Sequence, residues 1–114
     1  MRHKIVAGNW KMNKNAEETE DLLNALINQL PNDKEVEIIV APTFVNLASA
    51  VDHVEFTNIV VAAQNMHQSE NGAYTGEISA DMLKSIGVNT VILGHSERRS
   101  IFHETDAIIA YKVD

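Results

Sequence analysis

Residues 59–64 read Ile-Val-Val-Ala-Ala-Gln, a short apolar run that ends in a polar residue. Three similar runs, also rich in Val, Ile or Ala, stand at residues 4–8 (KIVAG), 36–41 (VEIIVA) and 90–94 (TVILG). Only the run at 36–41 is interrupted, by Glu37. Uninterrupted apolar runs of this length are typical of strands buried on both faces, as in a parallel sheet. The chain is therefore expected to carry four such strands.

Helical patterns separate the four runs. Residues 16–30 carry an apolar stripe at helical spacing, and Asn15 with Glu18 predicts a capping box at its start. Pro31 would end this helix. Further helices are predicted over residues 45–53, over residues 79–87 with Gly87 as a left-handed cap, and from about residue 105 onward. Strand and helix thus alternate four times, which indicates four βα units joined by right-handed crossovers.

Two completions of this pattern remain open, a doubly wound open sheet or part of a closed (β/α)8 barrel. Both place ligands at the carboxyl ends of the strands. Three of these ends carry polar or ionisable residues, namely Asn9 and Lys11, Gln64 and Asn65, and His95 and Glu97. Each residue alone has an ordinary alternative, since Asn9 can serve a turn and His95 can bond a carbonyl. Their convergence at one sheet edge predicts a functional site.

The composition restricts the class of protein. With 114 residues, 45% of them hydrophobic and 22% charged, the chain fits one small globular domain. The absence of cysteine excludes disulfide scaffolds, cysteine-ligated metals and thiol nucleophiles. A net charge of −7 argues against a nucleic-acid or anionic-membrane partner, whereas a small anionic molecule can still meet a local group of cations. No stretch resembles a membrane span or a signal peptide, so a cytoplasmic location is expected.

Several common catalytic motifs do not fit. Residues 8–13 (GNWKMN) hold a single glycine, which argues against a dinucleotide-binding loop. Residues 94–98 (GHSER) resemble a hydrolase nucleophile elbow, but Arg98 stands where a small glycine is needed, so Ser96 is a poor nucleophile candidate. The remaining histidines lack metal-ligand spacing and are expected on the surface or at helix ends: His3, His53, His67 and His103. No metal site is therefore predicted.

Three segments together resemble the triosephosphate isomerase family. Residues 7–13 (AGNWKMN), 72–77 (GAYTGE) and 92–99 (ILGHSERR) are similar to that family's first, third and fourth loops, in the same order. The resemblance implies an α/β fold that is half of a (β/α)8 TIM barrel, with four parallel strands and outer helices. Residues 1–114 would then form a single N-terminal half-barrel domain that ends within the fourth helix.

The resemblance also implies a reaction. It would be the interconversion of dihydroxyacetone phosphate and glyceraldehyde 3-phosphate through an enediolate, in glycolysis and gluconeogenesis, without metal or organic cofactor. Asn9 and Lys11 would contact the triose phosphate, and His95 would polarise its carbonyl. His95, Lys11 and Glu97 would be the catalytic residues. Lys11 would hold its ammonium against the developing negative charge, and Glu97 would lie beside Lys11. The sequence is compatible with a helix that begins just after His95.

The family resemblance further implies a homodimer. Thr75 and Tyr74, in the loop of residues 65–76, would lie at the dimer interface. Thr75 would insert into a neighbouring subunit beside its Asn9 and Lys11, and Gln64 would support that contact.

The sequence departs from the family pattern at two points. His103 stands where the family usually has Gly, which puts the geometry of the loop after Arg99 in question. More importantly, the family's carboxylate base follows the sixth strand and its phosphate-binding loops come later, and none of these is present. Glu97 and Glu104 are poor substitutes, because the former is better explained as a partner of Lys11 and the latter lies near a helix start.

Three hypotheses follow. The chain is the N-terminal half of an isomerase and is inactive alone, or it is a self-associating half-barrel scaffold without catalysis. The second reading rests on two unpaired sheet edges and an uncovered inner face. The third is a flavodoxin-like open sheet that binds a phosphorylated ligand, which a spatial strand order of 1-2-3-4 with all helices outside would exclude.

Overall fold

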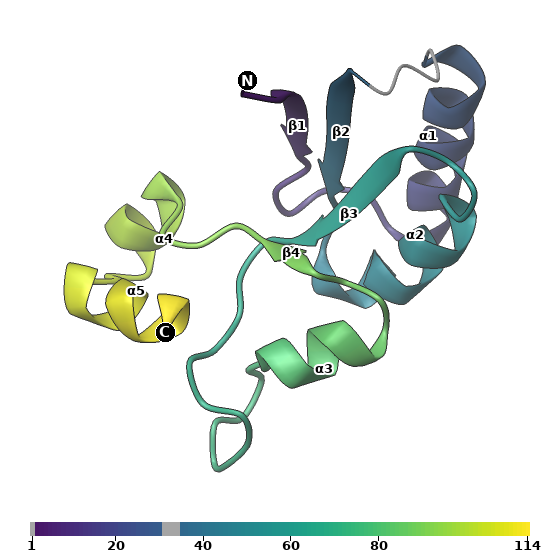
Figure 1. Cartoon of the computed structure of the whole chain (residues 1–114). Coiled ribbons are helices and arrows are strands. Elements are labelled where there is room, and N and C mark those ends of the chain that lie inside the picture. The colour runs from purple at the N-terminus through teal and green to yellow at the C-terminus, as the bar shows by residue number, and fades with distance from the viewer. Residues whose placement is uncertain (1, 31–34) are drawn as a thin grey trace.

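Four parallel strands form one sheet in the order of the chain. The structure, a computed structural model, describes residues 2–30 and 35–114. Each strand pairs in parallel with the next along the sequence (Figure 1). The strands are β1 (Lys4–Asn9), β2 (Val36–Ala41), β3 (Ile59–Ala63) and β4 (Thr90–Val91). This consecutive order is that of half a (β/α)8 barrel, and it excludes the flavodoxin-like open sheet, whose strand order reverses.

Helices follow each strand. They are α1 (Ala16–Gln29), α2 (Leu47–His53) after the short 3₁₀ turn η1 (Phe44–Asn46), α3 (Ala80–Ser85), α4 (Ser96–Ile101) and α5 (Asp106–Val113). All four predicted helices are confirmed within a few residues. The short helix α4 begins directly after His95, as the sequence allowed. Pro31, expected to end the first helix, lies outside the described residues.

Local signals explain where the helices start and stop. Asn15 Oδ1 accepts the Glu18 N–H at 2.9 Å, and Glu18 Oε1 accepts the Asn15 N–H at 3.1 Å, so the capping box is confirmed. Ser79 and Thr105 cap α3 and α5 through their side-chain oxygens. Gly87 follows α3 with φ +85°, the left-handed conformation predicted for it.

The core lies between the sheet and the first three helices. Val40 and Val61 stand opposite each other in the β2–β3 register and therefore share a face of the sheet. That face packs against apolar residues of the helices and of the loop before β4, which are Leu23, Leu47, Ala50, Leu83 and Val88. Figure 1 shows α1 and α2 on the same side of the sheet. The opposite, inner face of the sheet has no helix layer among the described residues.

The prediction that every apolar run would be buried on both faces is wrong for β1. Its residues Lys4–Gly8 are exposed, with Ile5 and Val6 at 56% and 63% exposure. β1 is an edge strand with an uncovered inner side, and neither α1 nor α2 reaches over it. The fourth run also pairs over a shorter length than expected, since β4 spans only Thr90–Val91, and Gly94 takes a left-handed φ of +65° before α4.

Candidate active site

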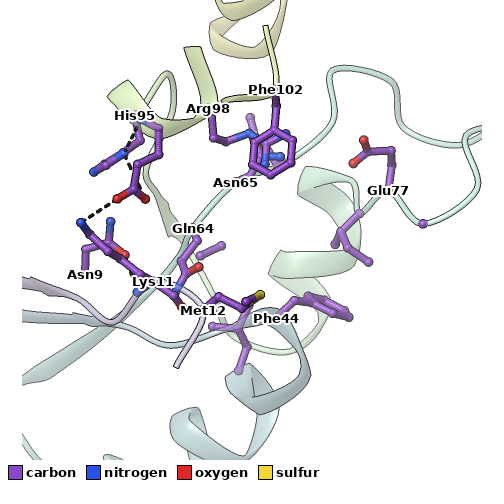
Figure 2. Close-up of a pocket in the computed structure, with 16 residues that line it drawn as sticks. Asn9, Lys11, Met12, Phe44, Gln64, Asn65, Glu77, His95, Arg98 and Phe102 are labelled. Atoms are coloured by element: carbon purple, nitrogen blue, oxygen red, sulfur yellow. Dashed lines mark hydrogen bonds and ion pairs between the residues drawn. The ribbon is translucent and has the colours of Figure 1, made fainter. Parts of the chain in front are cut away.

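The carboxyl ends of the strands meet around one cavity of about 440 Å³ (Figure 2). Asn9 ends β1, and Lys11 follows it in the next loop. Gln64 and Asn65 follow β3, and His95 follows β4. All five side chains, together with Glu97, line the cavity. These residues therefore lie together at one edge of the sheet, as the sequence predicted.

The loop after β1 is held in an unusual conformation. Lys11 has φ +56°, a left-handed geometry that is uncommon for a residue with a side chain. Its N–H donates to Asn9 Oδ1 at 2.9 Å, and its carbonyl accepts from Gln64 Nε2 at 2.8 Å. Gln64 Nε2 also donates to the Ala41 carbonyl at 2.8 Å, so it joins the ends of β1 and β2. Such strain persists where surrounding contacts fix it, and it concentrates at functional sites.

An ion pair connects this loop to α4. Lys11 Nζ lies 2.6 Å from Glu97 Oε1, with side chains 53% and 43% exposed. The hydrogen bond from Lys11 lowers the pKa of Glu97 below its ordinary value, so this carboxylate is a weak proton acceptor. An ion pair this exposed adds little to stability. Its effect is to fix where the Lys11 ammonium lies.

The imidazole of His95 has a defined tautomer. Its Nδ1 accepts the Glu97 N–H at 3.1 Å, at the first turn of α4. Nδ1 is also 3.8 Å from Glu97 Oε2, which is too far for a hydrogen bond. A ring nitrogen that accepts a backbone N–H has no proton of its own, so the imidazole carries its proton on Nε2. Nε2 is then the donor that His95 can offer to a ligand.

Three exposed apolar side chains form another part of the cavity wall. Met12 lies in the loop after β1, Phe44 begins η1 and Phe102 follows α4, and these side chains are 92%, 49% and 61% exposed. Apolar groups so exposed beside polar ones are typical of a binding or interaction surface.

The loop between β3 and α3 extends away from the sheet (Figure 1). Tyr74 packs on His67 with ring centroids 4.2 Å apart, and Thr75 is exposed. Neither Thr75 nor Tyr74 lines the cavity of its own chain, although Gly76 does. Gln64, expected to support a contact with a neighbouring subunit, bonds the loop after β1 in the same chain.

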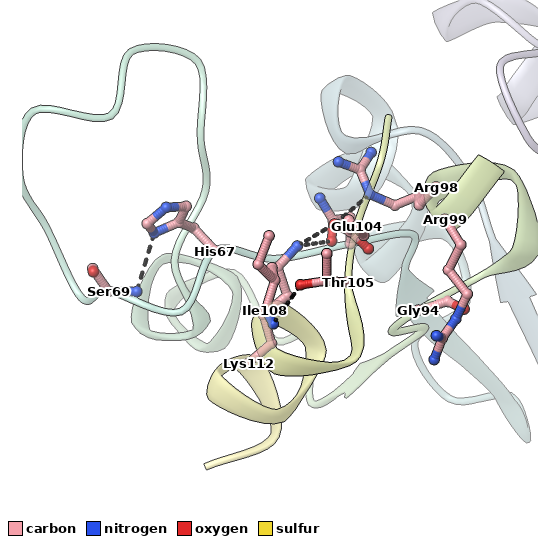
Figure 3. A network of polar contacts seen from close by, with 10 residues as sticks. His67, Ser69, Gly94, Arg98, Arg99, Glu104, Thr105, Ile108 and Lys112 are labelled. Atoms are coloured by element: carbon pink, nitrogen blue, oxygen red, sulfur yellow. Dashed lines mark hydrogen bonds and ion pairs between the residues drawn. The ribbon is translucent and has the colours of Figure 1, made fainter. Parts of the chain in front are cut away.

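A buried charge cluster that no sequence pattern predicted lies beside the cavity (Figure 3). Glu104 Oε2 accepts from Lys112 Nζ at 2.6 Å and from Arg98 Nε at 2.9 Å. Lys112 also donates to Asn65 Oδ1 at 2.9 Å. Burial raises the pKa of Glu104, but the hydrogen bonds from Lys112 and Arg98 outweigh it and hold the pKa below the ordinary value. Glu104 is therefore a structural anion and a poor base.

No signal in the sequence identified this cluster. Its members stand six and eight residues from Glu104 in the chain, on either side of the Thr105 cap, and these spacings match no helical neighbour pair. They come together only because the chain turns at residues 102–105, so that Arg98 and Lys112 both reach Glu104, and because Lys112 also meets Asn65 in the loop after β3.

The described ranges 2–30 and 35–114 contain no group of three or more His, Cys, Asp or Glu side chains arranged to hold a metal ion. Within the same part of the chain, no helix has the length and apolar character needed to cross a membrane.

A family model and the similar curated proteins indicate the same family. A family model described as triosephosphate isomerase matches residues 4–114. The triosephosphate isomerase of Flavobacterium psychrophilum is 82% identical over 114 residues, which are all of this chain and 46% of the relative. That of Flavobacterium johnsoniae is 68% identical with the same coverage. That of Clostridium botulinum is 50% identical over 113 residues, 99% of this chain and 45% of the relative. The chain spans just under half the length of these relatives.

Proposed function

The chain belongs to the triosephosphate isomerase family, and on this basis we propose that it supplies half of an isomerase active site. The substrates are dihydroxyacetone phosphate and glyceraldehyde 3-phosphate, which interconvert through an enediolate. The observation that carries the proposal is that Asn9, Lys11 and His95 line one cavity at the carboxyl ends of parallel strands. This is where ligands bind in barrels of this class.

Each residue has a distinct role in this proposal. His95 donates from Nε2 to the oxygen that becomes negative in the enediolate, while the Glu97 N–H holds its Nδ1. The Lys11 ammonium, oriented by Glu97, stabilises the negative charge of the substrate. Asn9 contacts the substrate and also fixes the loop that carries Lys11. Donors fixed before the reaction at the place where charge develops provide the largest contribution in catalysis of this type.

The proton on carbon needs a carboxylate base within hydrogen-bond reach, and the 114-residue chain does not provide a good one. Glu97 is bound to Lys11, and Glu104 is buried between two cations. Glu77 lines the cavity but is exposed on the long loop. We therefore expect the isolated chain to be inactive. Isomerase activity in purified chain that is lost in both His95→Gln and Glu77→Gln would contradict this.

A graft tests the half-site directly. Residues 1–114 replace the matched segment of the Flavobacterium psychrophilum relative, which is 82% identical to them. The expected result is an active isomerase in which His95→Gln or Lys11→Met lowers kcat at least a hundredfold, a typical loss when one stabilising donor is removed. Glu17→Gln, on the exposed start of α1, is the control and should leave kcat unchanged. An inactive but folded graft, or a graft insensitive to His95→Gln, would refute the proposal.

The proposal extends to assembly and location. A homodimer would use the loop of residues 65–76, with Thr75 and Tyr74 in contact with a neighbouring subunit and Gln64 holding the loop that receives them. The exposure of Met12, Phe44 and Phe102 supports an interface here. Thr75→Asp in the graft should then shift its mass from dimer to monomer, and an unchanged dimer would count against this interface. A cytoplasmic location belongs to the same proposal.

A second candidate role, a self-associating half-barrel scaffold, is favoured by one observation. The edge strand β1 exposes Ile5 and Val6 on opposite faces of the sheet. Each apolar side chain of this size loses about 1.5–3 kcal/mol of stabilisation when it stays in water. Association of the 114-residue chain would remove this cost.

A further inference from the structure

We propose that Asn46 is a positioning residue for the half-site, because it holds the loop of residues 10–15 in the conformation that presents Lys11. This inference rests on the isomerase function proposed above and adds a residue that does not line the cavity. Asn46 ends η1, after β2, and is only 2% exposed. It acts through the backbone of the loop and does not touch the substrate.

The loop of residues 10–15 contains two lysines with a left-handed backbone. Lys11 has φ +56° and Lys14 has φ +76°. In this region the Cβ is crowded by the backbone, so residues with a long side chain rarely adopt it. Two such residues in one short loop store strain, which persists only where surrounding contacts fix the conformation.

Each of these two lysines is held by a side-chain amide from another loop. Gln64, after β3, donates from Nε2 to the Lys11 carbonyl at 2.8 Å (Figure 2). Asn46 donates from Nδ2 to the Lys14 carbonyl at 3.0 Å. Asn46 therefore fixes the loop near its end in the same way as Gln64 fixes it near its start.

The position of Asn46 favours this role over a local one. Asn46 directly precedes α2, where an asparagine side chain commonly caps the helix. It makes no cap bond here. Its Nδ2 instead donates to the Lys14 carbonyl, 32 residues away in the chain, and to Thr43 Oγ1 at 3.2 Å. This buried amide thus stabilises a distant loop and not the start of its own helix.

The effect on the reaction passes through Lys11. Without the bond from Asn46, Lys14 can leave the left-handed region, and the few residues that connect it to Lys11 shift with it. A shift of about 1 Å in a group that contacts the substrate can cost up to about a hundredfold in rate. Asn46→Leu, which keeps a similar side-chain shape and removes the donor, should therefore lower kcat/KM by at least about tenfold.

The graft described above is the protein to test. Thr43→Val is the matched control, because it removes the other partner of Asn46 Nδ2 and leaves the Lys14 carbonyl bonded. It should leave kcat/KM unchanged. Asn46→Leu should also have no further effect on kcat/KM in a graft that already carries Lys11→Met, since its effect is transmitted by the Lys11 side chain.

The kinetic constants separate positioning from a loss of folded enzyme. The phosphate charge of the substrate is present before and after proton transfer, so a displaced Lys11 ammonium weakens binding and raises KM. A smaller folded fraction lowers the apparent kcat and leaves KM constant. Asn46→Leu should therefore raise KM.

Two changes at Lys14 test the same idea if Asn46→Leu does not fold. Lys14 is exposed, and Lys14→Val and Lys14→Gly remove the same charge. Valine resists a positive φ, whereas glycine adopts it freely. Lys14→Val should therefore raise KM and lower kcat/KM, as Asn46→Leu does, and Lys14→Gly should change neither.

Trypsin provides a readout that does not depend on catalysis, because it cleaves after lysine in loops that open. Fragments cut after Lys11 or Lys14 should form faster in Asn46→Leu than in Thr43→Val, as measured by mass spectrometry. Equal cleavage rates would contradict the hold on the loop, even in an inactive graft.

The two proposals fail in different ways. An unmutated graft that is inactive, or insensitive to Lys11→Met, contradicts the isomerase function. An active graft contradicts the role of Asn46 if Asn46→Leu and Lys14→Val leave kcat/KM unchanged. A fall in kcat/KM at constant KM, or one that persists in full beside Lys11→Met, would show that Asn46 is structural only.

Discussion

Replacement of Glu104 by Gln should destabilise the chain far more than the same change at Glu97. The two carboxylates form lysine ion pairs of equal length, 2.6 Å, but their surroundings differ. The Glu104 and Lys112 side chains are 6% and 5% exposed, whereas those of Glu97 and Lys11 are 43% and 53% exposed. Burial, and not distance, is therefore the variable that separates them.

The expected magnitude follows from the charge left behind. In Glu104→Gln the Lys112 ammonium stays buried and loses its anionic partner, a change that costs about 3–5 kcal/mol in proteins. The lower end of this range applies, because Lys112 keeps its bond to Asn65 Oδ1 and Arg98 is partly exposed. Glu97→Gln should change stability little, since water solvates the Lys11 ammonium once the pair is lost.

Urea unfolding followed by circular dichroism at neutral pH measures both variants. Equal losses of unfolding free energy in Glu104→Gln and Glu97→Gln would refute the role assigned to burial. The pH dependence provides a second check. The pKa of Glu104 is lower in the folded than in the unfolded chain, so its stabilisation is present above the unfolded pKa of about 4.3 and is lost as the pH falls through the folded value. The difference between wild type and Glu104→Gln should therefore shrink on the acid side.

Three further changes test the backbone. His103→Gly should raise the unfolding free energy by up to about 1 kcal/mol, because His103 follows the end of α4 at φ +59°, where glycine is free of strain; a loss would contradict this. Gly94→Ala should lower the melting temperature, since its Cβ would lie 2.9 Å from Ile109 Cδ1 at a φ of +65°; an unchanged value would show that α5 yields easily. Asn15→Ala should cost about 1 kcal/mol in urea unfolding, and Asn15→Gly only a few tenths, if the capping box acts as described.

The strands and helices could be predicted from the sequence because their signals are local, whereas these signals alone left open whether the sheet is doubly wound or half of a barrel. The apolar runs, the Asn15–Glu18 capping box and Gly87 each determine structure within a few neighbouring residues. The exposure of β1 could not be inferred from its composition, since Ile5 and Val6 are as apolar as the buried residues of β3. Their burial depends on which strand or helix lies beside them.

The site residues also differ in whether sequence signals could place them. Asn9, Lys11 and His95 could be placed together because parallel strands bring their carboxyl ends to one edge of a sheet in either of the two completions that the sequence left open. The Glu104–Lys112 cluster could not, because it depends on how α5 packs, and an i, i+8 pair has no pattern in sequence. The hydrogen bonds from Gln64 to the Lys11 and Ala41 carbonyls likewise depend on side-chain placement that no sequence pattern indicates.

The most direct measurement is a crystal structure of the graft with a non-reactive triose phosphate analogue. We predict that Lys11 Nζ and His95 Nε2 both lie within hydrogen-bond distance of the analogue's oxygens, with Nδ1 of His95 still bound to the Glu97 N–H. An analogue bound elsewhere, or a His95 ring turned so that Nδ1 faces the ligand, would contradict the half-site described for this chain.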